Sequence, residues 1–306
     1  MDLKECRDKL ELCYGPPLSI VSSCLRGFIV PKDGHVFIGA DFSSIEARVL
    51  AWLAGEEKIL EVFRTHGKIY ELAAAEIYRV SLDNVTKDQR QIGKVAVLAL
   101  GYGGGKGAFK TMAKGYGVNV GDDEAEGIKM RWREANSNIV KFWYELEDAA
   151  MRAIRFKGRE FVARKIKFKM AGSFLWCQLP SRRVICYPYP KIEMKMKHWG
   201  TEKESITYMS EDSLTRKWTR HETYGGSLSE NVTQAAARDV LAHAITTLES
   251  KNFPVVLHVH DEVLCEVPIS QACDLRDFET MVTMKPHWAE DLPLKAEAWS
   301  GTRYQK

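Results

Sequence analysis

The sequence lacks the features that mark secreted, zinc-binding and membrane-spanning chains. Its seven cysteines, an odd number, include no C-x-x-C pair, so they fit neither a disulfide framework nor a zinc knuckle. The longest apolar runs, residues 95–100 and 253–257, are far too short to cross a bilayer, and no charged-then-apolar leader stands at Met1. We therefore expect a cytoplasmic chain with no membrane contact and with reduced, mostly buried thiols.

No internal repeat or low-complexity tract is present, and 45% of the 306 residues are apolar, enough for one large domain or two ordinary ones. Charge is uneven along the chain. Residues 155–224 hold 16 Lys or Arg against 7 Asp or Glu, so the remainder carries a net charge of −6 although the whole chain is +3. This pattern suits a protein that holds a polyanion along one surface and keeps carboxylates for another task. A solvated basic face without a partner is the alternative.

The apolar periodicity predicts an α+β chain. Residues 1–25 read as a short helix stopped at Gly15, and residues 27–41 as two strands around a turn at 31–34. A helix capped by Ser43 or Ser44 should follow and stop at Gly55.

The rest of the pattern alternates helical and strand-like blocks. We expect residues 56–154 to be mainly helical, with glycine-rich joints at 101–107 and 115–121, and residues 155–224 to form basic strands. A helix at 229–250 and two strands within 253–267, around His260, Asp261 and Glu262, complete the prediction. Trp176, Trp199 and Trp218 could stack on bases, although packing is the more common role of tryptophan.

The first segment whose residue types suit a metal or catalytic site is DFSSIEAR at residues 41–48. Asp41 ends a predicted strand just before a helix begins, where a carboxylate is well placed to hold a hard cation. Taken alone, a helix-capping aspartate is the competing interpretation.

The second segment places Arg90, Lys94, Leu98 and Tyr102 at steps of four, which predicts one slowly drifting face of a single helix. The two cations suit triphosphate oxygens, and Leu98 with Tyr102 offers a flat surface near a base or sugar. An ordinary amphipathic helix with snorkelling cations is the alternative. The glycines at 101–107 do not form a Walker loop, because Lys106 is followed by Gly107 and no strand leads into them.

The third segment, HVHDE at residues 258–262, projects carboxylates from a predicted hairpin tip, which is a rigid mount for a metal ligand. A zinc site from His258, His260 and Asp261 is disfavoured, because strand alternation points the two histidines away from Asp261.

Together these segments resemble the motifs of family A DNA polymerases, in the family's order. Residues 41–57 resemble motif A (D-Y-S-x-I-E-x-R-x-L-A), residues 90–103 motif B (R-x-x-x-K-x-x-x-F/Y-G-x-x-Y-G) and residues 259–262 motif C (V-H-D-E). Residues 231–239 are similar to the helix that carries a template–primer glutamine, here Gln234. The resemblance spans residues 18–306, and the sequence at 179–181 and 299–304 is most similar to the phage branch of the family. This implies that the protein is located in the cytoplasm of a bacterium or of a phage-infected host cell.

The resemblance implies template-directed DNA synthesis with two Mg²⁺ ions, for which Mn²⁺ is a substitute. Asp41 and Asp261 would bind the ions, with the backbone carbonyl of Phe42 as a further ligand. His260 and Glu262 would flank the primer end, and Gln234 would contact template–primer DNA.

The same resemblance gives roles around the nucleotide. Arg90 and Lys94 would hold the triphosphate of the dNTP, and Lys94 would also donate a proton to pyrophosphate. Leu98 and Tyr102 would sit by the new base pair. Glu46 would accept the Tyr102 hydroxyl and crowd a ribose 2′-hydroxyl. Arg48 would orient Glu46 or the backbone.

The resemblance also implies an architecture. Residues 1–55 and 226–306 would form a palm with an antiparallel sheet, and residues 56–225 mainly helical fingers with the basic insertion 155–224. Leu98 and Ala99 depart from the family's aromatic and glycine, which predicts altered base stacking. No thumb or exonuclease is expected in the chain, so the expected partners are primer–template DNA, dNTPs and a separate thumb or exonuclease polypeptide.

Two alternatives to a self-sufficient polymerase remain at this point. One is a DNA-binding polymerase fragment or subunit that is inactive without a thumb-bearing part. The other is a metal-dependent phosphohydrolase, which would share the carboxylates but gives no reason for the Arg90 to Tyr102 spacing.

Overall fold

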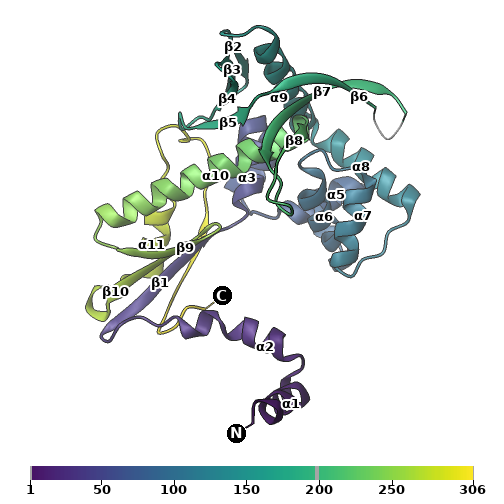
Figure 1. Ribbon diagram of the computed structural model, residues 1–306. Coiled ribbons are helices and arrows are strands. Elements are labelled where there is room, and N and C mark those ends of the chain that lie inside the picture. The colour runs from purple at the N-terminus through teal and green to yellow at the C-terminus, as the bar shows by residue number, and fades with distance from the viewer. Residues whose placement is uncertain (1, 197–199, 306) are drawn as a thin grey trace. The chain divides into compact units, whose positions relative to one another are not determined.

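The computed structural model describes residues 2–196 and 200–305, so Trp199 lies outside the described residues. The chain forms two compact units (Figure 1). The first comprises Met1–Ser43, Val240–Met284 and Leu294–Lys306, and the second Ser44–Asp239 and Lys285–Pro293. One long helix, α10 (Gly225–Ser250), contributes residues to both units.

The first unit is built on an antiparallel sheet. Its strand order is β11 (Ala296–Gly301), β1 (His35–Phe42), β10 (Glu262–Pro268), β9 (Val255–Val259). The helical elements of this unit outside α10 are α1 (Leu3–Tyr14), α2 (Pro17–Cys24), η1 (Arg26–Phe28), η3 (Ile269–Gln271) and α11 (Leu275–Val282). Because β1 has a partner on each side, its end is held firmly where the first motif lies.

An aromatic cluster fixes this sheet. Phe37, Leu264 and Tyr304 are buried together, and Trp299 packs against them. Gly39 is required at its position, because a Cβ there would lie 2.6 Å from the Trp299 ring. The sheet therefore closes around β1 only if residue 39 has no side chain.

The predicted hairpin before β1 is wrong in its first strand. Residues 29–34 form no strand, whereas β1 follows the prediction closely. The two edges of β1 are taken by β10 and β11, which are distant in the sequence. Pro31 lacks a backbone N–H, and Gly34 turns the chain with φ 73°.

The second unit begins with helices, as predicted. They are α3 (Ile45–Ala54), α4 (Glu57–Arg64), α5 (Ile69–Tyr78), η2 (Leu82–Asn84), α6 (Lys87–Leu100), α7 (Lys106–Gly115), α8 (Asp122–Ala135) and α9 (Ser137–Arg155). Thr86 and Gln89 form a capping box that starts α6. Helices α5 and α6 pack so closely that a Cβ on Gly93 would lie 2.1 Å from the Tyr70 carbonyl oxygen.

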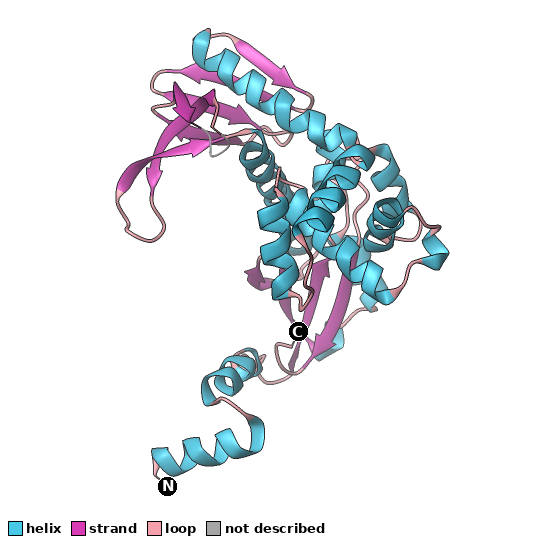
Figure 2. Ribbon diagram, turned by 90° about the vertical axis from the view of Figure 1, so that its right-hand side faces the viewer, coloured by secondary structure: helices cyan, strands magenta, loops and turns pink. Residues whose placement is uncertain are grey.

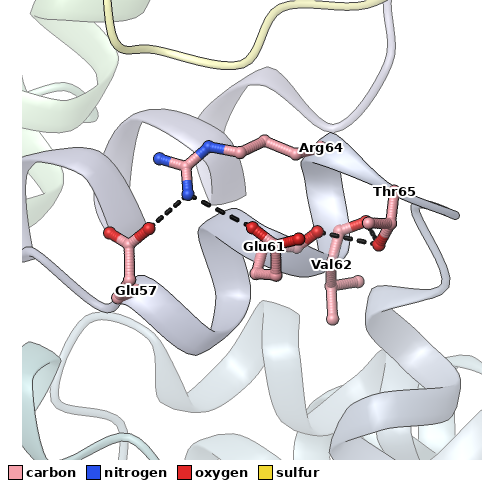
Figure 3. Close-up of polar contacts among 5 residues, drawn as sticks. All are labelled: Glu57, Glu61, Val62, Arg64 and Thr65. Carbon is pink, nitrogen blue, oxygen red and sulfur yellow. Dashed lines mark hydrogen bonds and ion pairs between the residues drawn. The ribbon is translucent and has the colours of Figure 1, made fainter.

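Helix α4 shows how these short helices end. Arg64, in its last turn, pairs with Glu57 and Glu61, and the Thr65 hydroxyl donates to the Glu61 carbonyl oxygen at 2.8 Å (Figure 3). The Thr65 hydroxyl thus adds a second donor to a carbonyl oxygen that already accepts from the Thr65 N–H, and the Arg64 charge lies near the negative end of the helix.

Two antiparallel sheets complete the second unit (Figure 2). The strands of the first, in order, are β2 (Glu160–Ala163), β3 (Ile166–Ala171), β4 (Phe174–Gln178) and β5 (Val184–Pro188). The strands of the second are β6 (Lys191–Met196), β7 (Glu202–Glu211) and β8 (Trp218–Thr223). The basic segment is thus strand-rich, as predicted, and α9 contacts β2, β3 and β4.

Several local expectations need correction. Helix α10 begins at Gly225, four residues before the predicted start. Ser44 occupies the N-cap of α3, but its left-handed backbone (φ 53°) gives no side-chain cap. The cysteines are not mostly buried: Cys177 and Cys265 are, whereas Cys13 and Cys24 are exposed and the other three are intermediate. Within residues 2–196 and 200–305, no helix is both long and apolar enough for a membrane span.

Candidate active site

The structure brings Asp41 and Asp261 together in the first unit. Asp41 lies on β1 opposite Glu262 of β10, and Asp261 lies in the turn between β9 and β10. The Phe42 N–H donates to the Asp261 carbonyl oxygen at 3.2 Å. Asp41 is not a helix cap, because it lies within β1 and Ser44 occupies the N-cap of α3.

The two carboxylates interact strongly. Burial raises the pKa of Asp261, and hydrogen bonding with Asp41 and the charge of Asp41 raise it further. His260 opposes this effect through its Nδ1, 3.1 Å from Asp261 Oδ1. Carboxyl groups held this close favour either a shared proton or a cation.

His260 itself is a surface residue. Its side chain is 71% exposed, and its backbone is left-handed, with φ 55°. This conformation turns the tip of the β9–β10 hairpin, where the imidazole is exposed while its Nδ1 contacts Asp261.

Glu262, by contrast, is 1% exposed. Trp299 Nε1 donates to its Oε1 at 3.3 Å, and the Tyr304 hydroxyl donates to its Oε2 at 2.6 Å. Burial and the Glu262 carboxylate raise the pKa of Tyr304 to about 12. Glu262 therefore ties the hairpin to the C-terminal strand region, and its predicted contact with DNA stays a prediction.

The protein oxygens around Asp41 and Asp261 suit a hard divalent cation. Across the described part of the chain, no group of three or more His, Cys, Asp and Glu side chains is arranged to hold a metal ion. Two neighbouring carboxylates are nevertheless the kind of partial set that Mg²⁺ uses when substrate and water supply its remaining ligands. The mutual repulsion that raises the Asp261 pKa is what a bound cation would relieve.

The predicted phosphate-binding cations lie on α6 in the second unit. Arg90 Nε pairs with Glu71 Oε1 at 2.7 Å, and its guanidinium lies 5.4 Å from the Tyr70 ring centre. Lys94 Nζ lies 4.8 Å from the Tyr116 ring centre. Arg90 is thus held by Glu71 and Tyr70, and Lys94 by Tyr116, and a bound triphosphate would compete with these contacts.

The single-helix prediction for this face is wrong at its end. Arg90, Lys94 and Leu98 belong to α6, but the helix stops at Leu100 and Tyr102 lies beyond it. Gly101 forms the C-cap, and Gly103 then takes φ 78°, a conformation that continues no helix. Leu98 is 39% exposed.

Glu46 and Tyr102 form the predicted pair. The Tyr102 hydroxyl donates to Glu46 Oε2 at 3.0 Å. Burial raises the pKa of Tyr102, and the Glu46 charge raises it further, so this hydroxyl stays a donor at any physiological pH. A cavity of about 80 Å³ adjoins the pair, with a largely apolar lining that includes Leu50, Leu72 and Ile139.

Arg48 is buried and holds the backbone, one of the two roles predicted for it. Its Nη1 donates to the Pro293 carbonyl oxygen at 3.0 Å, and its guanidinium lies 4.2 Å from the Phe63 ring centre. Burial lowers the pKa of Arg48 to about 10.

Gln234 is exposed on α10. Nearby, Arg183 braces the helix: its Nε pairs with Asp239 Oδ1 at 2.5 Å, and its Nη2 donates to the Ala235 carbonyl oxygen at 2.7 Å. The Gln234 side chain is thus exposed to solvent, and Arg183 holds the part of α10 that carries it.

The residues that hold the site residues in place could not be predicted from the sequence. Glu71 behind Arg90, Arg183 beside Gln234, and Trp299 with Tyr304 around Glu262 were not predicted in these roles. A buried glutamate needs hydrogen-bond donors, so knowing that Glu262 is buried would have predicted partners such as Trp299 and Tyr304. The sequence does not show that Glu262 is buried.

Comparison with known proteins identifies the family of this chain. The model of DNA polymerase family A matches residues 19–171. The chain is 42% identical to the DNA polymerase of Bacillus phage SP02 over 302 residues, 98% of this chain and 46% of that protein. It is 25% identical to DNA polymerase I of Caldicellulosiruptor bescii over 285 residues, 92% of this chain and 28% of that protein.

A solved structure has the same fold. It is the POL domain of Pol1 from M. smegmatis in complex with DNA primer-template and dNTP, with a TM-score of 0.56 and 18% identity, covering 92% of this chain and 42% of that one. The chain spans less than half the length of each of these three relatives. Its fold is α+β, and the chain belongs to DNA polymerase family A.

Proposed function

We propose that this chain catalyses template-directed DNA synthesis. The observation that carries the proposal is the interacting pair of Asp41 and Asp261, in a chain that belongs to DNA polymerase family A. In the reaction, the primer 3′-oxygen bonds to the α-phosphorus of a dNTP. The bond from that phosphorus to the bridging oxygen breaks, pyrophosphate leaves, and the hydroxyl proton passes to solvent.

Family A DNA polymerases use divalent metal ions, and we assign two Mg²⁺ ions, replaceable by Mn²⁺, to Asp41, Asp261 and the Phe42 carbonyl. When bound, they supply activation of the primer hydroxyl and stabilisation of the charge that develops on pyrophosphate. The carboxylates contribute the negative charge that holds these ions, which explains why two of them stand together at the cost of mutual repulsion.

The second unit supplies the groups for the nucleotide. Arg90 and Lys94 bind triphosphate oxygens once they leave Glu71 and Tyr116, and Lys94 gives a proton to the departing pyrophosphate. Tyr102 and Leu98 lie beside the base, and Glu46, fixed by the Tyr102 hydroxyl, leaves no room for a ribose 2′-hydroxyl.

DNA contacts complete the proposal. Gln234 and His260 are exposed and meet the primer–template, and Glu262 acts from the turn that carries Asp261. We assign residues 1–55 and 226–306 to a palm and residues 56–225 to fingers. A separate thumb or exonuclease polypeptide is a further partner in this proposal.

Extension of a labelled primer on a template, with Mg²⁺ and all four dNTPs, tests the function. Asp261→Asn and Asp41→Asn should each lower the rate by at least about 10²-fold, as loss of a preorganised charged group does. Asp33→Asn is the matched control, because this carboxylate is exposed in the turn before β1 and should not affect extension.

Equal extension by all four proteins would refute the role of the pair. If the wild-type chain binds primer–template but extends nothing with either Mg²⁺ or Mn²⁺, the fragment alternative replaces the proposal. Activity restored by an added thumb-bearing polypeptide would then establish that alternative.

A further inference from the structure

The four-stranded sheet of the second unit has one open face. On its inner face, Phe168 of β3 lies opposite Cys177 of β4, and Met170 lies opposite Leu175; all four are buried. The alternation of the strands directs Lys167 and Lys169 of β3, with Phe174 and Trp176 of β4, to the other face.

Three aromatic rings form a row on this open face. The ring centres of Trp176 and Phe174 are 5.6 Å apart, and those of Phe174 and Tyr189 are 6.2 Å apart. Tyr189 is 53% exposed, and Phe174 and Trp176 are partly exposed. Rings that are held by one another and still meet solvent present flat surfaces to a ligand.

Cations lie beside the rings. In the strand register Lys169 is directly opposite Trp176, and Lys167 is opposite Gln178 on the same face. Lys167 pairs with Glu160 at 3.1 Å, but both side chains are about half exposed, so this ion pair is weak and exchangeable. The face belongs to the segment with 16 basic against 7 acidic residues.

The combination of rings and lysines favours one class of ligand. Lysine is depleted in protein–protein interfaces, whereas single-stranded nucleic acid binds through aromatic rings that stack on bases and cations that meet phosphates. A duplex offers its phosphates but hides its base faces, so it would leave the rings without a role.

We propose that the open face of β2–β5 binds single-stranded DNA, with bases on Trp176, Phe174 and Tyr189 and phosphates at Lys167 and Lys169. The choice of DNA rests on the proposed function, in which the template ahead of the primer is unpaired. The surface itself is defined without reference to the carboxylate pair.

Binding of a labelled oligodeoxythymidylate of about 12 nucleotides, within the site sizes of single-strand binders, tests the proposal by fluorescence anisotropy. Trp176→Ala should weaken binding by about 5- to 150-fold, the range for loss of one base–aromatic stack. Trp176→Phe should retain most of the affinity. Trp218→Ala, at an exposed tryptophan of the other sheet, is the matched control and should bind as the wild type does.

A second variant keeps the test independent of the folding of Trp176→Ala. Lys167→Gln with Lys169→Gln changes two exposed side chains and should lower the slope of log affinity against log salt by about 1.4, or 0.7 for each phosphate contact. The proposal is overturned if both the slope and the Trp176→Ala affinity equal the wild-type values. It is also overturned if Trp176→Ala weakens only duplex binding, or if Trp218→Ala weakens binding as much.

Asp261→Asn separates this inference from the proposed function. That variant should bind the oligonucleotide with wild-type affinity while losing primer extension. If the wild type extends nothing but its oligonucleotide binding depends on Trp176, the open face stands and the proposed function fails. If extension occurs but binding ignores Trp176 and the two lysines, the reverse holds.

Discussion

Replacement of Tyr304 by phenylalanine should destabilise the first unit without changing its packing. The Tyr304 hydroxyl donates to Glu262 Oε2 at 2.6 Å, and both residues are nearly inaccessible to solvent. The phenylalanine ring would keep the contact with Trp299, whose ring centre is 6.0 Å away. The substitution therefore removes one hydrogen bond to a buried carboxylate and little else.

The magnitude follows from the hydrogen bond that is lost. A hydrogen bond to a charged group contributes about 1.5–3 kcal/mol, so Tyr304→Phe should lower the free energy of unfolding by that amount. The pKa of Tyr304 is raised from an ordinary value of about 10 to about 12, first by burial and then by the hydrogen bond and charge of Glu262. The direction of this pKa shift agrees with a hydroxyl that is held as a donor to Glu262.

The raised pKa also fixes the pH dependence. Below pH of about 10, folded and unfolded Tyr304 are both protonated and the contribution is fully present. As pH rises from there through about 12, the unfolded chain loses the proton first and the contribution is lost. The stability difference between wild type and Tyr304→Phe should therefore narrow across this alkaline window.

Urea denaturation at a series of pH values measures both effects. Tyr144→Phe is the matched control, since this tyrosine is 61% exposed, and it should change stability by less than about 0.5 kcal/mol. A double-mutant cycle with Glu262→Gln should give a coupling energy of at least about 1 kcal/mol. A loss no larger than that of the control, or a cycle without coupling, would refute the reasoning.

Other predictions concern the site and the helices. Without divalent ions, Asp261→Asn should melt no lower than the wild type, because the repulsion between Asp261 and Asp41 is removed. Its melting temperature should also not respond to added Mg²⁺. A melting temperature below that of the wild type, or the wild-type response to Mg²⁺, would contradict this prediction. Gly93→Ala should lower the free energy of unfolding by about 3 kcal/mol, since its Cβ would lie 2.1 Å from the Tyr70 carbonyl oxygen. Gly107→Ala in α7 is the control: its Cβ would meet no atom within 4 Å, so it should raise the free energy of unfolding by about 0.5–1 kcal/mol. Similar urea midpoints for the two variants would count against the packing argument. Arg64→Ala should leave thermal unfolding and primer extension unchanged, because its ion pairs with Glu57 and Glu61 lie on the surface; a lower melting temperature would show otherwise.

Local periodicity was sufficient for most elements of this chain. It predicted β1, the helices between residues 45 and 155, the basic strands and the β9–β10 turn, because each follows from the spacing of apolar side chains and from glycine or proline stops. It failed before β1, where a hairpin was expected and the partners of the strand came from residues 262–268 and 296–301. Pairing with distant strands leaves no trace in local sequence.

The site residues divide in the same way. Glu46 with Tyr102 was predicted through resemblance to the family, and the structure confirms their hydrogen bond. The ion pair of Arg90 with Glu71 was not predicted, because it depends on how α5 packs on α6. The end of α6 before Tyr102 was also missed, since a spacing of four continues in the sequence after the helix has stopped.

The sequence by itself determined the class of fold, the motifs and the residue types that can hold cations, phosphates and bases, since these depend on local spacing and side-chain chemistry. Only the tertiary structure decided which of those groups are buried, which carboxylates repel one another, and which face of the basic sheet stays open. Burial and proximity arise from contacts between segments far apart in the chain, and the free energies that tune a charged group depend on those contacts rather than on its neighbours in sequence.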